Sequence, residues 1–214
     1  PVTIGRSESM SKSKKNVVDP GAIIDRYGAD TARWFMLSDS PPERDLPWTE
    51  AGIEGSWRFV NRVWRLFGEA DAGAEGQDKA LDRKLHQTID GVAKDIESLG
   101  FNKAVAKIYE LVNAIEKARP SASRTTAIRT LALLVAPMTP HLAEEGWAQM
   151  GQDNGCSGLI AEASWPAVDP ALLVDDEVDE LPVLPKLDEL LDDEPDEPDE
   201  DEELLPDDPP VEPG

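Results

Sequence analysis

The residues best suited to chemistry lie in one short polar stretch, Glu8–Pro20, which reads ESMSKSKKNVVDP. Three serines and three lysines surround a single methionine there, and Gly5 before it and Pro20-Gly21 after it mark a loop between elements. Ammonium groups neutralise phosphate charge, and small hydroxyl side chains let the backbone approach and donate hydrogen bonds. The stretch therefore fits a polyphosphate ligand, although a solvated charged loop or a nucleic-acid patch has the same composition.

A second candidate surface is the helix predicted from Thr49 or Glu50 to Glu69. Apolar residues repeat every three to four positions along it, with Trp57, Val60, Trp64 and Phe67 on one stripe and Phe59, Val63 and Leu66 widening it. Opposite this stripe, Arg58, Asn61, Arg62 and Arg65 share one polar face. Guanidinium groups match phosphate geometry, so the face suits RNA, and a solvated face that pairs with neighbouring acids is the alternative.

The polar stretch resembles the signature loop of class I aminoacyl-tRNA synthetases, usually written KMSKS. This resemblance implies that the loop closes over ATP, with Ser9, Met10, Ser11, Lys12 and Ser13 as ATP-binding residues and Lys12 as the catalytic contact to pyrophosphate. The family usually has lysine where this chain has Ser9, which removes one cationic contact. The methionyl, isoleucyl and valyl members usually have glycine before the motif's Asn, where this chain has Lys15.

Three further segments are similar to the leucyl-tRNA synthetase family in particular: YGADTAR at 27–33, SPPERDLPW at 40–48 and GIEGSWRFVNRVWRL at 52–66. The similarity covers roughly residues 2 to 178. It implies a leucine–tRNA ligase, which forms leucyl-adenylate from leucine and ATP and transfers leucine to tRNA(Leu). It also implies Mg²⁺ with the ATP, no metal ligand in this chain, and tRNA contacts through Arg58, Arg62 and Arg65.

The elements that must position these residues are predicted to be helices. We expect helix over most of Gly21–Leu37, with a break at Gly28 and Asp30 as an N-cap. After a linker at 71–78, four more helical segments follow: Asp82–Ser98, one capped by Asn102, one from Ser121 or Ser123, and one opened by Thr139 and Pro140. Short connections predict antiparallel neighbours in a bundle.

The segment Ala136–Glu145 also resembles class I synthetases that have an α-helical anticodon-binding domain. Gly146 stands where the leucyl enzymes usually have leucine, which predicts a local loss of packing. His141, Glu144 and Glu145 have no third ligand cluster nearby in sequence, and a single cysteine excludes zinc-ligand spacing, so we expect no metal site.

The fold class expected is therefore mainly α, in three parts: the loop and the end of a catalytic domain at 1–48, a helical anticodon-binding-type domain at 49–174, and an acidic tail at 175–214. Because four apolar stripes lie between Asp82 and Met150, we expect the bundle to fold without the residues up to Ala74. The tail should be disordered, because prolines and acids dominate it.

Charge divides the chain unevenly. It has 44 acidic and 21 basic residues, and the tail holds 20 of the acids beside the single basic residue Lys186. A lone cysteine fits a reducing compartment, and the sequence has no apolar run of membrane-spanning length and no signal peptide, so we expect a cytoplasmic protein without a membrane partner. We also expect no DNA partner and a monomer.

The chain begins at Pro1 inside a polar loop and has no His-x-Gly-His sequence, so we expect a fragment that is inactive alone. Two rival hypotheses remain. The chain could be a non-catalytic RNA-binding helical module with an acidic interaction tail, or a plain helical scaffold whose tail binds basic partners.

Overall fold

Helices make up the part of the chain that the computed structural model describes, residues 8–38, 40–41 and 43–173, in which no strand occurs. The α-helices are α1 (Pro20–Tyr27), α2 (Ala29–Ser38), α3 (Glu50–Phe67), α4 (Lys79–Glu97), α5 (Phe101–Lys117), α6 (Ala122–Val135) and α7 (Pro140–Met150). Short 3₁₀ turns follow at Gln152–Asn154, Ile160–Glu162 and Pro170–Leu172. The mainly α fold class is thus confirmed; the predicted disorder of the tail lies outside the described residues.

Most helices begin where a side chain caps them. The side chains of Asp19, Thr49, Asp78 and Ser121 accept backbone N–H groups at the starts of α1, α3, α4 and α6. Each satisfies one of the donors that the first helical turn leaves without a partner. The helix starts predicted at Thr49 and Ser121 are therefore confirmed, whereas α4 begins three residues before the predicted Asp82.

Two predicted caps are wrong. Asp30 is the second residue of α2, and its carboxylate accepts hydrogen bonds from α7 instead of from its own helix. Asn102 lies inside α5, which begins at Phe101 after Gly100 with no side-chain cap. Both residues have the chemistry of a cap, but the helix starts one residue earlier than each of them.

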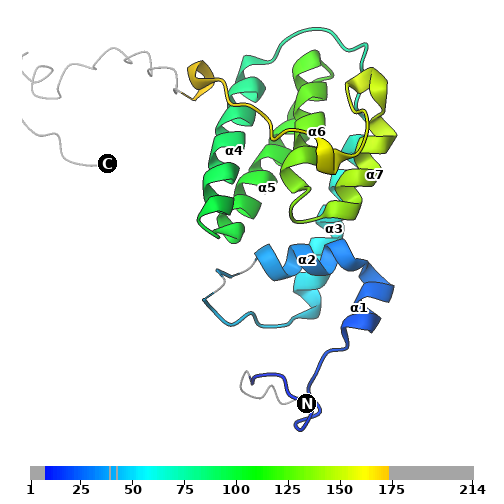
Figure 1. Cartoon of the computed structure of the whole chain (residues 1–214), viewed down its shortest axis with the longest axis vertical. Helices are drawn as coiled ribbons and strands as arrows, with labels where there is room; N and C mark the ends of the chain where they lie inside the picture. Colours follow the sequence, from blue (N-terminus) through cyan, green and yellow to red (C-terminus); the bar gives the residue numbers. More distant parts are fainter. Residues whose placement is uncertain (1–7, 39, 42, 174–214) are drawn as a thin grey trace, which may run out of the picture. The chain divides into compact units, whose positions relative to one another are not determined.

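The helices α4, α5, α6 and α7 form a bundle (Figure 1), and its buried side chains share one hydrophobic core with those of α2 and α3. The α2 side chain Trp34 is fully buried, and its ring stacks on Phe59 of α3 at 4.6 Å between centroids. The Trp34 indole N–H also donates to the hydroxyl of Tyr109 in α5 at 3.3 Å. Residues of α2 and α3 thus fill part of the core, and the expectation that the bundle folds without the residues up to Ala74 stays a prediction.

The buried face of α3 also differs from the prediction. Ile53, Ser56, Phe59, Val63, Leu66 and Phe67 are the buried residues. Trp57 and Trp64, placed on the predicted core stripe, are 45% and 37% exposed. The apolar residues of this helix cover a wider arc than the buried face occupies, so periodicity alone could not select the buried stripe, and the Trp34–Phe59 contact decides it.

Gly146 is not a packing defect. It is buried in α7, and a Cβ atom built on it would overlap the Cδ2 and Cε2 atoms of Phe67, which is 1% exposed. The Phe67 ring from α3 therefore occupies the space that a larger residue would fill. The predicted loss of packing is wrong for this reason.

Candidate functional site

The predicted ATP-binding residues Ser9–Ser13 lie on one exposed loop whose turn is closed by its own polar groups. The Ser11 backbone N–H donates to Oδ1 of Asn16 at 2.8 Å, and the Asn16 amide donates to the Ser9 carbonyl at 3.4 Å. The hydroxyls of Ser11 and Ser13 lie 2.9 Å apart. Asn16, which was not singled out from the sequence, therefore folds the chain that follows the motif back onto Ser9 and Ser11.

The three lysines of the loop differ in their partners. Lys14 pairs with Glu8 at 3.1 Å, and both side chains are more than half exposed, so the pair adds little stability. Lys12 and Lys15 have no ion pair or side-chain hydrogen bond within the described chain. The ammonium group of Lys12 is thus available to an anionic ligand.

Lys15 has a left-handed backbone conformation, with φ of 53°. Its N–H donates to the Lys12 carbonyl at 3.2 Å and closes the turn. A side chain with a Cβ is disfavoured in this region, whereas glycine enters it freely. The conformation explains physically why a glycine suits the position before the motif's Asn.

An open groove of about 800 Å³ runs beside the loop. Its lining is mostly apolar, with Met10 and Val18 from the loop, Ile23 from α1, Met36 from α2 and Trp48. Lys12 does not line this groove. Met10 of the loop therefore lines the apolar groove, whereas Lys12, the lysine predicted to contact phosphate, lies outside it.

Asp30 and Arg33 of α2 bind the turn between α6 and α7 and the start of α7, and we call this pair of residues the clamp. The Asp30 carboxylate accepts the Leu142 N–H at 2.6 Å and lies 3.0 Å from Nδ1 of His141. The Arg33 guanidinium donates to the carbonyls of Met138 and Pro137 at 2.9 and 3.0 Å. Two sequence segments more than 100 residues apart thus meet at one joint.

The three arginines predicted to contact tRNA fall into two groups. Arg62 is engaged inside the protein, because its guanidinium donates to both carboxylate oxygens of Glu116, at 3.1 and 2.7 Å, and to Oδ1 of Asn113 at 2.7 Å. The hydrogen bond from Arg62 lowers the pKa of Glu116, and the same bond raises the pKa of Arg62. Arg62 therefore has its charge neutralised.

Arg58 and Arg65 are exposed and have no hydrogen bond or ion pair within the described residues. The exposed rings of Trp57 and Trp64 follow the same helix at the preceding positions. Because consecutive residues of a helix point about 100° apart, the two arginines and the two tryptophans lie on neighbouring sides of α3, and we call the surface of these four residues the α3 face. Arginine and tryptophan side chains offer phosphate contacts and stacking surfaces for unpaired bases.

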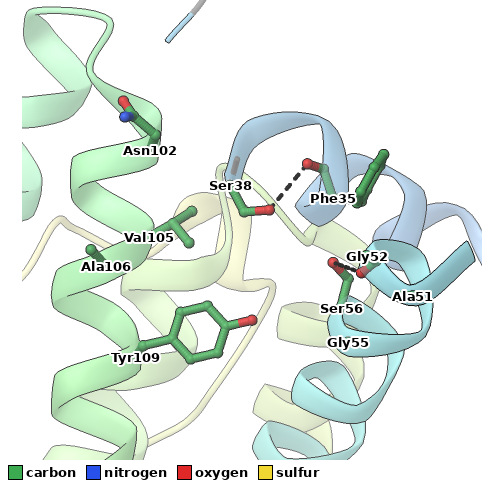
Figure 2. A pocket seen from close by; sticks show the side chains of 10 residues that line it. All are labelled: Phe35, Ser38, Ala51, Gly52, Gly55, Ser56, Asn102, Val105, Ala106 and Tyr109. Carbon is green, nitrogen blue, oxygen red and sulfur yellow. Dashed lines mark hydrogen bonds between the residues drawn. The ribbon is translucent and has the colours of Figure 1, made fainter. Parts of the chain in front are cut away.

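A pocket of about 310 Å³ borders the α3 face, between α5 and the facing ends of α2 and α3 (Figure 2). Gly52, Gly55 and Ser56 form one wall and Tyr109 stands on the opposite wall. A Cβ added to Gly55 would meet only the Arg58 guanidinium, at 3.8 Å, which places Arg58 at the rim. Burial raises the pKa of Tyr109, so its hydroxyl stays neutral.

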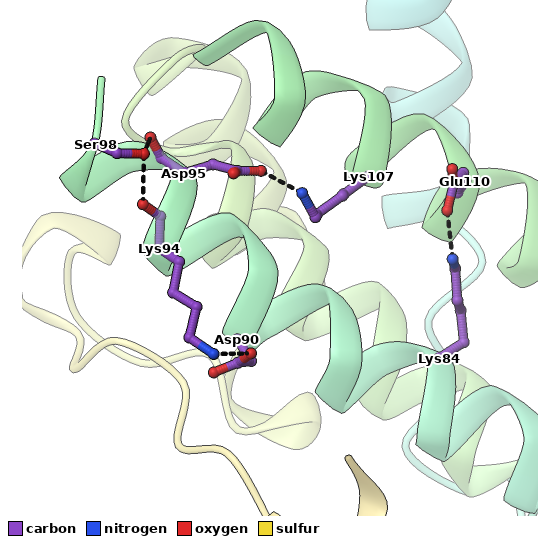
Figure 3. Close-up of polar contacts among 7 residues, drawn as sticks. All are labelled: Lys84, Asp90, Lys94, Asp95, Ser98, Lys107 and Glu110. Atoms are coloured by element: carbon purple, nitrogen blue, oxygen red, sulfur yellow. Dashed lines mark hydrogen bonds and ion pairs between the residues drawn. The ribbon is translucent and has the colours of Figure 1, made fainter. Parts of the chain in front are cut away.

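The surface formed by α4 and α5 carries lysines of a different kind (Figure 3). Lys84 pairs with Glu110 at 2.5 Å, Lys94 with Asp90 at 2.7 Å and Lys107 with Asp95 at 2.5 Å. Gly91 leaves room for the aliphatic stem of Lys107, which a Cβ there would meet at 2.6 Å. Because neighbouring carboxylates neutralise these lysines, they are less available for phosphate contacts than the arginines of the α3 face.

Comparison with known families identifies this architecture. Residues 78–192 match the family model described as the anticodon-binding domain of tRNA ligase, which is more than half of the chain. The chain belongs to this anticodon-binding family. Residues 2–49, which include the loop, match the family model of class I tRNA synthetases for isoleucine, leucine, methionine and valine.

Relatives of this anticodon-binding chain carry the name leucine–tRNA ligase. Those from Novosphingobium aromaticivorans and Rhizorhabdus wittichii are 72% and 68% identical over 178 residues, 83% of the chain. The chain spans about a fifth of the length of these relatives, 20% and 21%. A crystal structure of the Agrobacterium radiobacter K84 agnB2 LeuRS–tRNA–LeuAMS ternary complex aligns with a TM-score of 0.68 and 31% identity, over 77% of this chain and 23% of that one.

The described residues of this anticodon-binding chain were also compared with the requirements of a metal site and of a membrane-spanning helix. Within the described residues, no three His, Cys, Asp or Glu side chains gather to hold a metal ion, and His141 and Glu144 make other contacts: His141 with Asp30, and Glu144 with the Ile160 N–H. None of the helices in the described ranges is long and apolar enough to cross a membrane.

Proposed function

We propose that this chain is the part of a leucine–tRNA ligase that carries the ATP-facing loop and the helical domain that holds tRNA(Leu). The complete enzyme forms leucyl-adenylate from leucine and ATP and then transfers leucine to the tRNA. The loop within 1–48 belongs to the catalytic domain, and residues 49–174 form the tRNA-holding domain. The match of residues 2–49 to class I synthetases, together with the unpaired Lys12, carries this proposal.

In this proposal Lys12 stabilises the charge that builds on pyrophosphate as the adenylate forms. An ammonium group free of internal partners can follow the phosphates, whereas Lys14 is already bound to Glu8. The hydroxyls of Ser11 and Ser13 add hydrogen-bonding groups on the same turn. The described residues offer no cluster for Mg²⁺, so we assign no metal contact to this chain.

The experiment requires this segment in a complete leucine–tRNA ligase, because positioning by the rest of the catalytic domain is part of the chemistry. We expect Lys12→Ala to lower the turnover of leucine-dependent pyrophosphate exchange by about 10²–10³-fold with a smaller effect on ATP affinity, as for other lost transition-state contacts. Lys14→Ala and Lys15→Ala are the matched controls. An unchanged rate in Lys12→Ala with a lost rate in Lys15→Ala would contradict the assignment.

The α3 face is the surface that we propose for the tRNA backbone. Arg58 and Arg65 supply charges without internal partners, Trp57 and Trp64 supply exposed rings, and Arg62 acts through its bond to Glu116 as a structural residue. This assignment removes Arg62 from the direct contacts that the arginine spacing predicted. It also favours the tRNA-binding domain over a plain helical scaffold.

A binding experiment on the present chain tests the face. We expect the double variant Arg58→Glu/Arg65→Glu to weaken tRNA binding and to reduce the slope of log K against log salt by about 2, one for each lost phosphate contact. Lys79→Glu/Lys103→Glu is the matched control, since both lysines are exposed and the change in net charge is equal. Equal losses in the two variants would refute a specific role of the α3 face.

A further inference from the structure

A second polar pocket lies away from the loop and away from the α3 face. It occupies about 490 Å³ between α4, α6 and the segment 155–167 that follows α7. This volume is in the range of small-molecule sites. Its polar lining includes the side chains of His86, Thr126, Arg129, Ser157 and Ser164.

Arg129 brings an uncompensated positive charge to this pocket. The residue is half-buried in α6, and its guanidinium has no hydrogen bond or ion pair within the described chain. Gly155, at φ of 73°, lies so close that an added Cβ would be 2.8 Å from an Arg129 terminal nitrogen. The glycine therefore makes the room in which the guanidinium lies.

His86 faces the same pocket with a defined tautomer. Its Nδ1 accepts the backbone N–H of Asp169 at 2.9 Å, so the proton of the neutral imidazole is on Nε2. The remaining ring nitrogen is thus a hydrogen-bond donor. Together with the hydroxyls of Thr126, Ser157 and Ser164, the lining is rich in donors.

The lining has no Asp or Glu among the residues that the structure describes. The lining also has apolar side chains, those of Leu85, Ile89, Leu133 and Trp147. Hydrogen-bond donors and a free guanidinium in the same pocket as apolar side chains fit a ligand with one anionic head and a short hydrocarbon body. We propose that this pocket binds a small organic carboxylate, held by Arg129 and His86 at the head and by the apolar side chains along its hydrocarbon body.

Titration of the full chain with hexanoate tests this site, followed by ¹H–¹⁵N NMR. We expect saturable shifts at amides of 126–133 and 155–167, and at least tenfold weaker binding of hexanol, which lacks the charge but has the same length. Inorganic phosphate, which lacks the apolar body, should also bind at least tenfold more weakly than hexanoate. Absence of saturation, or equal affinity for hexanol or phosphate, would overturn the proposal.

Two variants separate the site from general effects of charge. Arg129→Gln should weaken hexanoate binding at least tenfold, because a charge-assisted pair is lost. Gly155→Ala keeps the arginine but displaces its guanidinium, so it should weaken binding in the same direction without a change in net charge. Arg119→Gln, at an exposed position outside the pocket, is the control and should leave binding unchanged. Binding within twofold of the parent chain in both pocket variants would exclude Arg129 as the head-group contact.

Discussion

At the scale of single residues, Gly146 shows how one missing side chain permits one contact. The Phe67 ring lies where a Cβ at 146 would be. We expect Gly146→Ala to lower the free energy of unfolding by about 1–3 kcal/mol, because overpacking outweighs the gain of about 1 kcal/mol in helix propensity. Urea denaturation measures the change.

Gly55→Ala is the matched control for this substitution. It is also a glycine inside a helix, but its added Cβ would meet nothing closer than 3.8 Å. We expect a gain of about 0.5–1 kcal/mol there. A Gly146→Ala protein at least as stable as the parent chain would show that Phe67 moves aside without cost.

The Arg62–Glu116 pair predicts a dependence of stability on pH. Since the arginine lowers the pKa of Glu116 from its usual 4.5, the pair stabilises the folded state above about pH 4.5, and this contribution is lost as pH falls through the lowered value. Glu116→Gln should therefore be less stable than the parent chain at pH 7, by under about 1 kcal/mol because both partners are partly exposed. The difference should shrink in acid.

The comparison is best repeated in an Arg62→Gln background, by urea denaturation at pH 7, 4.5 and 3. Without Arg62, the largest cause of the lowered pKa of Glu116 is gone and only the charges of Arg65 and Arg124 still lower it, so the pH dependence of the effect of Glu116→Gln should become smaller. An undiminished pH dependence in this background would assign the lowered pKa to those two arginines instead of Arg62.

At the scale of elements, the clamp formed by Asp30 and Arg33 joins α2 to the start of α7. Thr139 occupies the N-cap position of α7 but makes no side-chain cap, and Asp30 accepts the Leu142 N–H in its place. We expect Asp30→Ala to cost about 1–3 kcal/mol, since it removes a cap and leaves the partly buried Leu142 N–H without its partner. Asp25→Ala, on exposed α1, should cost little.

Hydrogen exchange can locate this loss as well as measure it. Amides at the start of α7 should lose protection first in Asp30→Ala, whereas those in the middle of α5 should follow the global stability. Uniform loss of protection along the chain would mean that the carboxylate stabilises the fold in another way.

Most helices could be predicted because their causes are local. Apolar residues such as Leu85, Ile89 and Val92 repeat at helical spacing, and a cap such as Thr49 precedes its helix directly. What sequence reasoning missed depends on contacts between distant segments. The exposed position of Trp57 follows from the Trp34–Phe59 contact, and the true partner of Asp30 lies 112 residues away. In the loop, the motif residues were recognisable, but the role of Asn16 required the folded turn.

At the scale of the whole molecule, charge is the dominant feature. The net charge is −23, yet most of it comes from residues 175–214, and the α3 face is cationic. We expect a chain that ends at Leu173 to bind tRNA more tightly than the full chain at about 50 mM salt, because the acidic segment repels phosphate at long range. Fluorescence anisotropy at two salt concentrations measures this.

The advantage of the shortened chain should nearly vanish at about 200 mM salt, where the Debye length falls below about 8 Å. A difference that persists unchanged at high salt would point to a short-range effect of the removed residues. Equal affinity at low salt would show that the tail's charge does not reach the tRNA.

The clamp also fixes an order of events during synthesis. Asp30 leaves the ribosome 112 residues before Leu142, which at cellular elongation rates is a delay on the order of ten seconds. Throughout that time the Asp30 carboxylate lacks the hydrogen bond from the Leu142 N–H. The Trp34 indole likewise lacks its hydrogen bond to the Tyr109 hydroxyl until α5 has been made. The nascent chain thus exposes the partner surfaces of α2 for longer than isolated helices need to form, and α2 completes its contacts only after α5 and α7 have been made.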